Sequence, residues 1–258
     1  MNEVCDASPP MYRLTFRGDE DLLDAVLPLL PGGVREDEDA LVAYSGAPFS
    51  DAVLALTGGA VDEVPADWKQ RKMSAGVVIG GVVGIRSPFD RESGAPIEVV
   101  VERRGSAFGS GSHPTTQMCV ALLLELEPGG SVADLGCGVG TLAIVAAKLG
   151  WAPVVGVDRV PVAIEVAREN VERNGVDVDV AVSDLAVDDI PLANVLLVNA
   201  PPPVHERVAA AVDDRVRHVI VSGIVAEEME DVVRRYTGFK IAKALGTEDE
   251  WIALRLSC

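Results

Sequence analysis

The sequence is poor in aromatic residues, histidine and cysteine, and it has no long apolar run. The three histidines and four cysteines are widely separated and form no C-x-x-C pair, which argues against a disulfide framework and a metal site. Scattered cysteines of this kind favour a cytoplasmic protein. The longest uncharged apolar stretch, Gly76 to Ile85, is well short of the roughly 18 residues of a membrane span, and the first residues lack the pattern of a signal peptide. We therefore expect no membrane association.

Basic residues are few: the chain has 22 of them and 40 acidic residues, which gives a formal charge of −18. A field of this sign repels nucleic-acid backbones and anionic lipids, whereas it attracts a basic protein partner. Aromatic residues make up only 4% of the chain, so no basic stripe with stacking aromatics suggests nucleic-acid binding. The alternative interpretation is that the acidic surface serves solubility or a salt-rich host.

The length of 258 residues suits a large α/β domain with a smaller companion, and 48% apolar with 24% charged residues is a globular composition. Residues 1–60 are predicted to form a small N-terminal α/β domain, with a strand at Tyr12–Arg17 and a helix at Glu20–Leu30. Residues 61–95 are predicted to be a connector that contains a strand at Val77–Ile85.

Residues 96–258 are predicted to form the second domain, in which short apolar strands alternate with helices. Strands are predicted at 97–101, 131–134, 154–158, 178–182, 195–199 and 219–222. Helices are predicted at 139–149, 161–174, 203–212 and 225–236. A further helix is predicted to start after Ser112 as its N-cap and to run to about Leu126. Phe239–Ala244 and Trp251–Leu256 are predicted to form a closing hairpin. The pattern indicates an α/β fold with a mostly parallel sheet, helices on both faces and an antiparallel hairpin at the edge.

A glycine-rich turn follows the strand at Ser131–Asp134 and precedes a helix. Gly136, Gly138 and Gly140 permit positive φ and close approach of a ligand, and the helix N-terminus offers free N–H donors. Roughly 20 residues later the next strand ends in Asp158, whose carboxylate can accept hydrogen bonds from both ribose hydroxyls of a nucleoside. This pattern predicts a nucleoside cofactor at the turn.

Asp134 and Thr141 help to distinguish between a dinucleotide and other nucleoside cofactors. A dinucleotide fingerprint places its third glycine where this chain has Thr141, and the carboxylate of Asp134 would disfavour a pyrophosphate. The same carboxylate would suit S-adenosyl-L-methionine, which carries an ammonium and a sulfonium. The pattern therefore predicts a Rossmann-like class I methyltransferase and disfavours an NAD oxidoreductase. The alternative role for Asp134 is that of a helix-capping carboxylate.

Two further strand ends carry polar side chains. Asp184 follows the third strand, where it could accept from the exocyclic amine of adenine or form a simple turn. Asn199 ends the fourth strand, next to the expected position of the transferable methyl group. Its carbonyl can accept from an attacking amine, so Asn199 is the predicted catalytic residue, unless it only forms a rigid turn before the prolines that follow.

The run from Ala107 to Thr116, A-F-G-S-G-S-H-P-T-T, resembles the A-F-G-T-G-T-H-P-T-T signature of the PrmA family of ribosomal protein methyltransferases. The similarity continues through the glycine-rich turn, through Asn170 to Val176, and into the last strand. It covers residues 96–256, whereas residues 11–95 match mainly in length and in the Asp67-Trp68 pair.

This resemblance implies methylation of amino groups, on lysine side chains or an α-amine, of a ribosomal protein that the small N-terminal domain recognises. It also implies that Thr116, Gly136, Asp158 and Asn199 contact S-adenosyl-L-methionine and that Phe108 lines the same site.

The chain departs from the family pattern at Asn199-Ala200-Pro201-Pro202-Pro203, where the family has N-I-L-A or similar. The segment is similar to the N-P-P-Y loop of other amine methyltransferases. Another protein or a small-molecule amine is therefore an alternative substrate, and a non-catalytic cofactor-binding regulator is a third hypothesis.

Overall fold

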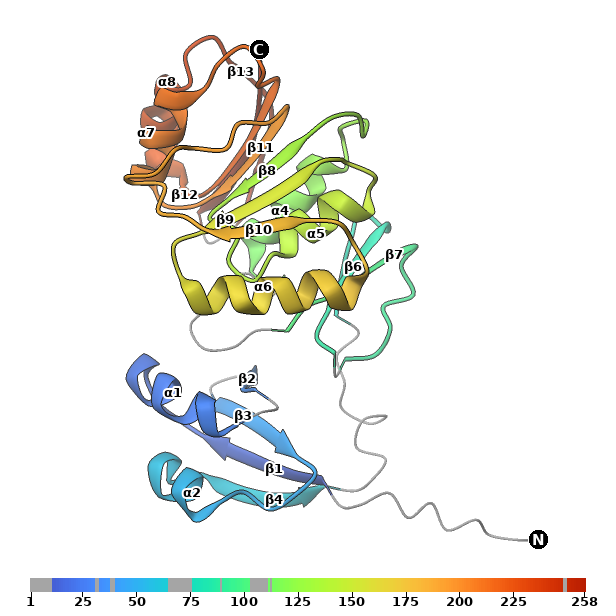
Figure 1. The fold of residues 1–258 in the computed structure, drawn as a ribbon, viewed down its shortest axis with the longest axis vertical. Helices are drawn as coiled ribbons and strands as arrows, with labels where there is room; N and C mark the ends of the chain where they lie inside the picture. The colour runs from blue at the N-terminus through green and yellow to red at the C-terminus, as the bar shows by residue number, and fades with distance from the viewer. Residues whose placement is uncertain are drawn as a thin grey trace, which may run out of the picture. The chain divides into compact units, whose positions relative to one another are not determined.

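The computed structural model describes residues 11–30, 33–37, 40–64, 76–88, 90–102, 111, 113–247 and 250–258 (Figure 1). The described residues divide into two compact units, one between residues 11 and 64 and the other from Gly76 to Cys258. Residues 76–95, expected to be part of a connector, thus belong to the second unit. No helix within the described ranges is long and apolar enough to cross a membrane.

Over its described residues, the first unit is an antiparallel sheet with two short α-helices. Its strands lie in the order β2-β3-β1-β4 and span Met11–Phe16 (β1), Arg35–Asp37 (β2), Ala40–Ser45 (β3) and Ala60–Val64 (β4). Its helices span Glu20–Val26 (α1) and Asp51–Thr57 (α2), and the 3-10 helix η1 spans Leu27–Leu29. The predicted helix at Glu20–Leu30 is therefore shorter, because Pro28 lacks the N–H that would continue the α-helical ladder. Strand β4 pairs with β1, so this unit extends past residue 60.

The core of the first unit lies on one face of its sheet. Leu14 and Phe16 alternate along β1 and therefore point to the same side. They pack in one cluster with Leu23 of α1 and Val53 of α2. Both helices thus cover the same face, which is how a four-stranded sheet of this size buries an apolar surface.

The second unit begins with a three-stranded sheet in the order β5-β6-β7. Its strands span Val77–Ile79 (β5), Val83–Arg86 (β6) and Ile97–Val100 (β7). The single strand predicted at Val77–Ile85 is wrong, because Gly80 and Gly81 both have positive φ and the Val82 N–H donates to the Ile79 carbonyl. Two consecutive glycines make a tight hairpin turn at no steric cost, and the apolar residues on either side form its two strands.

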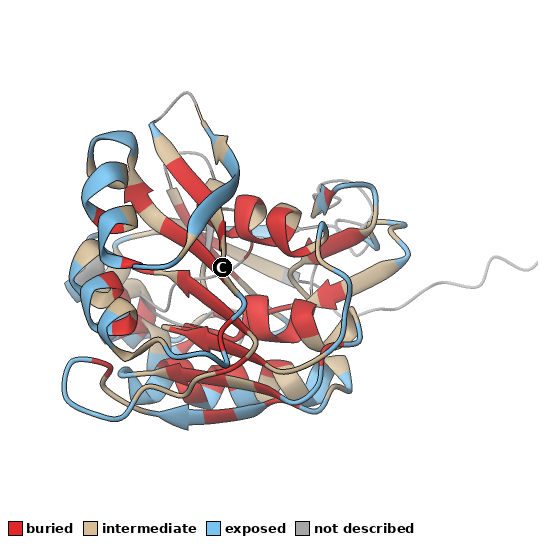
Figure 2. Cartoon of the chain, turned by 90° about the horizontal axis from the view of Figure 1, so that it is seen from above, coloured by how far each residue is buried: buried red, intermediate tan, exposed pale blue. Residues whose placement is uncertain are grey.

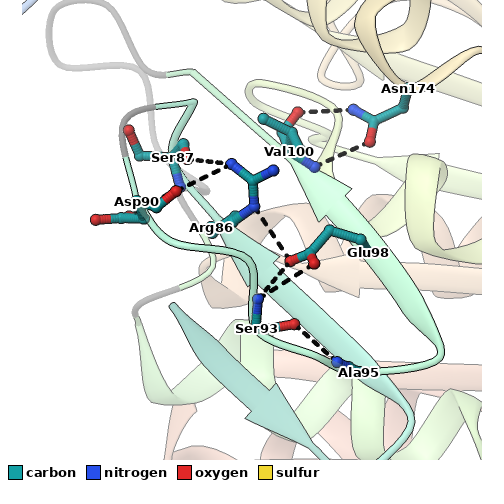
Figure 3. Close-up of polar contacts among 8 residues, drawn as sticks. All are labelled: Arg86, Ser87, Asp90, Ser93, Ala95, Glu98, Val100 and Asn174. Carbon is teal, nitrogen blue, oxygen red and sulfur yellow. Dashed lines mark hydrogen bonds and ion pairs between the residues drawn. The ribbon is translucent and has the colours of Figure 1, made fainter. Parts of the chain in front are cut away.

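Polar contacts hold this small sheet together and tie it to the following helices (Figure 3). Arg86 Nε lies 3.2 Å from Glu98 Oε1, and the Ser93 N–H donates to the same carboxylate. At the end of β7, Asn174 accepts from the Val100 N–H at 2.9 Å and donates to the Val100 carbonyl at 2.7 Å. The two bonds position the chain that leaves β7 against helix α6.

A seven-stranded sheet forms the centre of the second unit, in the order β10-β9-β8-β11-β12-β14-β13. The strands span Val132–Leu135 (β8), Val154–Asp158 (β9), Asp179–Val182 (β10), Val195–Asn199 (β11), His218–Val225 (β12), Lys240–Gly246 (β13) and Trp251–Ser257 (β14). The first five are parallel, and β14 runs antiparallel to both of its neighbours. The predicted α/β fold with a mostly parallel sheet and a closing antiparallel hairpin is confirmed.

In the described part of the second unit, the α-helices that accompany the sheet span Pro114–Leu123 (α4), Thr141–Lys148 (α5), Pro161–Asn174 (α6), Pro202–Ala211 (α7) and Met229–Arg235 (α8), with the 3-10 helix η2 at Ala226–Glu228. Helix α6 has the predicted bounds, and Gly175 ends it in the left-handed conformation. Helix α4 ends three residues before the predicted Leu126, and its N-cap is His113 and not Ser112. Ser112 itself lies outside the described residues.

Alternate residues of the central strands face opposite layers of helices. Val132 and Leu197 belong to the cluster that contains residues of α4, α5 and α6. Ala133 and Leu196 belong to the cluster that contains residues of α7 and α8. The central strands are buried from both sides, as the red segments of Figure 2 show. Apolar strands without polar alternation are the sequence signature of this arrangement.

Candidate functional site

The polar residues predicted at strand ends lie at one edge of the sheet. Asp134 is aligned with Gly156 of β9 and Leu197 of β11, so β8 separates these two strands. Asp158 ends β9, and Asn199 ends β11 opposite Ser222. Because these strands are parallel, their carboxyl ends meet at the same edge, where open α/β sheets bind ligands. The structure thus brings the predicted residues on β8, β9 and β11 to one site.

The glycine-rich turn leaves room beside its backbone. Gly136, Gly138 and Gly140 have φ angles of 84°, 53° and 85°, a region that side chains other than glycine rarely adopt. Among the described residues, a Cβ atom built on Gly136 would have only the Ala200 Cβ nearby, at 3.9 Å. A Cβ on Gly140 would instead lie 3.3 Å from the Cβ of Ala167 in α6. The described part of the chain therefore leaves space for a ligand beside Gly136, whereas Gly140 lets two helices approach closely.

Asp158 organises the turn from the neighbouring strand. Its Oδ2 accepts from the Gly138 N–H at 2.9 Å, and its Oδ1 accepts from the Val160 N–H at 3.0 Å. The side chain is partly exposed, and each carboxylate oxygen retains a lone pair for a further donor. Asp158 can therefore hold the turn and accept from the hydroxyls of a ribose at the same time.

Asp134 is a buried carboxylate with no cation beside it in the described part of the chain. It is 1% exposed, and its Oδ2 accepts from the Ala143 N–H at 3.0 Å, in the first turn of α5. Burial raises the pKa of Asp134 to about 7, and the nearby charge of Asp158 adds to this increase. Asp134 therefore does accept from an N–H in the first turn of α5, as the alternative role predicts. A single neutral donor does not offset the charge of the ionised carboxylate.

Asn199 is held by a residue that the sequence analysis did not single out. Its Nδ2 donates to Thr115 Oγ1 at 3.1 Å, and Thr115 Oγ1 lies 2.7 Å from His113 Nδ1. Thr115 and Thr116 are both 1% exposed, and the side chain of Thr115 is bonded to His113 and Asn199. Thr116 Oγ1 is buried without a hydrogen-bond partner among the described residues, as expected of a hydroxyl that serves a ligand. Thr115 is the first threonine of the H-P-T-T motif, so the motif could have indicated that its side chain belongs to the site.

Asn170 is a second residue whose structural role the sequence did not predict. It is fully buried in α6, and its Nδ2 donates to the carbonyl of Val139 in the glycine turn at 3.0 Å and to that of Glu102 at 2.9 Å. Its Oδ1 accepts from the Glu102 N–H. One amide therefore fastens the glycine turn to the segment that leaves β7. A buried asparagine in an amphipathic helix pattern is the signal that could have found it.

Asp184 lies in a tight turn after β10. Its Oδ1 accepts from the Ala186 N–H at 2.9 Å, and its own N–H donates to Asp188 Oδ2 at 2.8 Å. These contacts are those of the simple turn considered as the alternative, and contact with adenine stays a prediction. Phe108, predicted to line the same site, lies outside the described residues.

The segment after Asn199 presents no free backbone donor over its described residues. The Ala200 N–H donates to the Ser222 carbonyl at 3.1 Å, and the next three residues are prolines, which have no N–H. Pro201 is the N-cap of α7, so the prolines begin a helix. A Cβ on Gly223 would lie 2.6 Å from the Ala200 nitrogen, so β12 and this segment are in close backbone contact.

His205 of α7 contacts the same Ser222 carbonyl that accepts from the Ala200 N–H. It is fully buried; its Nε2 lies 3.0 Å from the Ser222 carbonyl and its Nδ1 lies 3.1 Å from the Tyr236 hydroxyl. Since a carbonyl only accepts, Nε2 carries the proton and Nδ1 accepts from Tyr236. Burial lowers the pKa of His205, which keeps the ring neutral.

The donor set fits a cationic nucleoside such as S-adenosyl-L-methionine. Considering the described residues alone, there is space beside Gly136, the buried hydroxyl of Thr116 lacks a partner, and the charge of Asp134 lacks a counter-ion. The carboxylate of Asp158 can accept from ribose. No group of three or more His, Cys, Asp or Glu side chains placed for a metal ion occurs in the described part of the chain.

Comparison with known proteins identifies the family. The family model of ribosomal protein L11 methyltransferase (PrmA) matches residues 66–257. Ribosomal protein L11 methyltransferase of Burkholderia lata is 32% identical over 245 residues, covering 88% of this chain and 81% of that protein. The enzyme of that name from Thermotoga neapolitana is 40% identical over 197 residues, covering 74% and 73%. The ribosomal protein L11 methylase structure from Lactobacillus delbrueckii subsp. bulgaricus has a TM-score of 0.55 at 27% identity, covering 62% of this chain and 84% of that one.

These matches confirm the resemblance drawn from the glycine-rich turn and the H-P-T-T motif, and they make the chain a methyltransferase. The chain belongs to the ribosomal protein L11 methyltransferase (PrmA) family.

Proposed function

We propose that this chain transfers methyl groups from S-adenosyl-L-methionine to amino groups of a ribosomal protein, the counterpart of L11. The observation that carries the cofactor assignment is the buried carboxylate of Asp134, which has no cation beside it among the described residues. A ligand with an ammonium and a sulfonium would supply the missing positive charge, whereas a pyrophosphate would add a second negative one. Membership of a family of protein methyltransferases supports the protein substrate.

Asp134, Gly136, Asp158 and Thr116 are the residues that would hold the cofactor. When bound, S-adenosyl-L-methionine supplies a methyl group on a positively charged sulfur, which is already a good leaving group. Little acid or base catalysis is then required, so alignment and exclusion of water account for most of the rate. The chain's contribution is to fix the acceptor amine beside Asn199.

The attacking amine has to be neutral, although a free lysine has a pKa of about 10.4. Removal from water and a nearby positive charge both lower that pKa. The carbonyl oxygen of Asn199 can accept one N–H bond of the amine and so direct its lone pair. The segment after Asn199 has no free N–H to compete for that lone pair, since Ala200 is already bonded to Ser222 and the prolines have no donor.

The charge of the chain supports a basic protein as the partner. A formal charge of −18 favours encounter with a basic ribosomal protein and opposes direct binding to nucleic acid or to anionic lipid. We assign recognition of the protein substrate to the first unit, since the family model matches residues 66–257 and the candidate cofactor site lies in the second unit. The cytoplasm, where ribosomal proteins are made, is the proposed location.

The test is a transfer assay with purified chain, S-adenosyl-L-methionine labelled on the methyl group, and unmethylated ribosomal protein L11. We expect label in L11, with peptide masses showing methyl groups on amines. Asn199→Ala should lose most of the turnover while the melting temperature stays close to that of the wild type. Glu230→Gln, an exposed change in α8, serves as the matched control and should behave as the wild type does.

Other outcomes separate the alternatives. Label in a different protein or in a small amine would move the substrate to the interpretation suggested by the Asn199 to Pro203 segment. Binding of the cofactor without transfer to any acceptor would favour a non-catalytic regulator. Full turnover by Asn199→Ala would remove Asn199 from the active role.

A further inference from the structure

A directional chain of hydrogen bonds runs from the end of β11 to the first turn of α4. Asn199 Nδ2 lies 3.1 Å from Thr115 Oγ1, which lies 2.7 Å from His113 Nδ1. The backbone N–H of Thr115 also donates to His113 Nδ1, at 3.3 Å. Asn199 and Thr115 are 84 positions apart in the sequence, and sheet and helix packing bring them together.

The direction of each bond follows from the one group whose role is fixed. A backbone N–H only donates, so His113 Nδ1 carries a lone pair and the proton of the neutral ring sits on Nε2. The hydroxyl of Thr115 must then donate its hydrogen to Nδ1. With that hydrogen used, Thr115 Oγ1 can only accept, and the partner it faces is the NH₂ group of Asn199.

The surroundings favour this arrangement over its reverse. Thr115 is 1% exposed, so an unmatched acceptor there would be costly. Burial lowers the pKa of His113, which keeps its ring neutral and Nδ1 free to accept. Trp251 of β14 packs edge-on against the ring, with centroids 5.3 Å apart and an interplanar angle of 76°. The ring is therefore fixed in the orientation that the hydrogen bonds require.

We propose that Thr115 and His113 are positioning residues that pin the amide of Asn199 so that its carbonyl oxygen, and not its NH₂ group, faces the acceptor amine. A flipped amide would donate to the nitrogen lone pair and occupy the electrons needed for attack. The pinned amide selects acceptors that carry an N–H bond. The inference rests on the proposed function, since it names how that site holds its amine.

Thr115→Val tests the proposal because valine has nearly the same shape without the hydroxyl. We expect kcat on ribosomal protein L11 to fall about 10- to 100-fold, since the amide loses the partner that fixes its orientation. Thr115→Ser keeps the hydroxyl and should retain turnover within about threefold. The affinity for S-adenosyl-L-homocysteine should stay within about threefold in both variants, because the side-chain contacts of Thr115 are with His113 and Asn199, and Asp134, Gly136, Asp158 and Thr116 are left in place.

His113 supplies an independent pair of variants. In His113→Asn, the side-chain oxygen can accept from both the backbone N–H and the hydroxyl of Thr115, and asparagine is a good N-cap, so turnover should be largely kept. His113→Ala removes the acceptor and should lower kcat as Thr115→Val does. A general loss of structure would reduce cofactor affinity and melting temperature as well, and Asn would not rescue it.

The side-chain amide itself gives a readout that needs no activity. In the wild type and in Thr115→Ser, the Asn199 NH₂ resonances should exchange slowly with solvent, and in Thr115→Val they should exchange fast. Unchanged exchange, or equal kcat in Thr115→Val and the wild type, would overturn the positioning role. Absence of methyl transfer by the wild type with slow amide exchange would instead refute the proposed function and leave the hydrogen-bond chain intact.

Discussion

Titration of Asp134 is expected to control cofactor affinity in the mildly acidic range. Its folded-state pKa is about 7 because the carboxylate is buried, against an ordinary value of 3.8. The folded chain therefore holds this proton up to about pH 7, whereas the unfolded chain releases it near pH 3.8. The stability that this group contributes is complete below pH 3.8 and is lost progressively as the pH rises to about 7. At about 1.36 kcal/mol per pH unit, ionised Asp134 costs the folded chain about 4 kcal/mol.

A cationic ligand binds the ionised form and recovers part of that cost. Below pH 7 each unit of acidification should therefore lower the affinity for S-adenosyl-L-methionine about tenfold. Calorimetry between pH 5.5 and pH 7, repeated in buffers of different ionisation enthalpy, measures the affinity and the protons released on binding. We expect close to one proton released at the acidic end. An affinity that is flat across this range would refute the argument.

Asp134→Asn is the matched variant, since its amide oxygen can still accept from the Ala143 N–H. At pH 8 it should melt at a higher temperature than the wild type, because the buried charge is gone. Its cofactor affinity should be weak and nearly independent of pH. A lower melting temperature at pH 8 would show that the charge is compensated, and the assignment of a cationic ligand would lose its basis.

Three further substitutions test the frame of the site. Asp158→Ala removes the acceptor of the Gly138 N–H, so the affinity for S-adenosyl-L-homocysteine measured by calorimetry should fall at least about tenfold. Asp158→Asn keeps an acceptor oxygen and should be less affected. Equal affinity of Asp158→Ala and the wild type would contradict the ribose assignment. Gly223→Ala places a Cβ 2.6 Å from the Ala200 nitrogen at a φ of 77° and should cost more than about 1–3 kcal/mol of unfolding free energy in denaturant titrations. His205→Gln tests acid sensitivity: burial lowers the pKa of His205 below its ordinary 6.5, so the wild type loses stability as the pH falls below about 6.5, and the variant should lose less. Parallel melting curves for the two proteins would argue against a neutral buried histidine.

Much of the second unit could be predicted from local sequence. The strand bounds at Val154–Asp158 and Val195–Asn199 and the helix bounds at Pro161–Asn174 agree with the structure. Apolar runs bounded by glycine, proline or a charged residue are strong local signals. The apolar run Val77–Ile85 does not form one strand as predicted, because Gly80 and Gly81 have positive φ and turn the chain back. The resulting hairpin joins a sheet whose third strand begins at Ile97.

The sequence by itself determined the class of fold and the strand ends where chemistry is possible, because periodic burial and glycine conformation are properties of neighbouring residues. Only the tertiary structure decided which polar groups meet. Asn199 and Thr115 are 84 residues apart, and their contact depends on how α4 packs against the sheet. The same is true of the elevated pKa of Asp134, since loss of water around a carboxylate depends on every element packed over it.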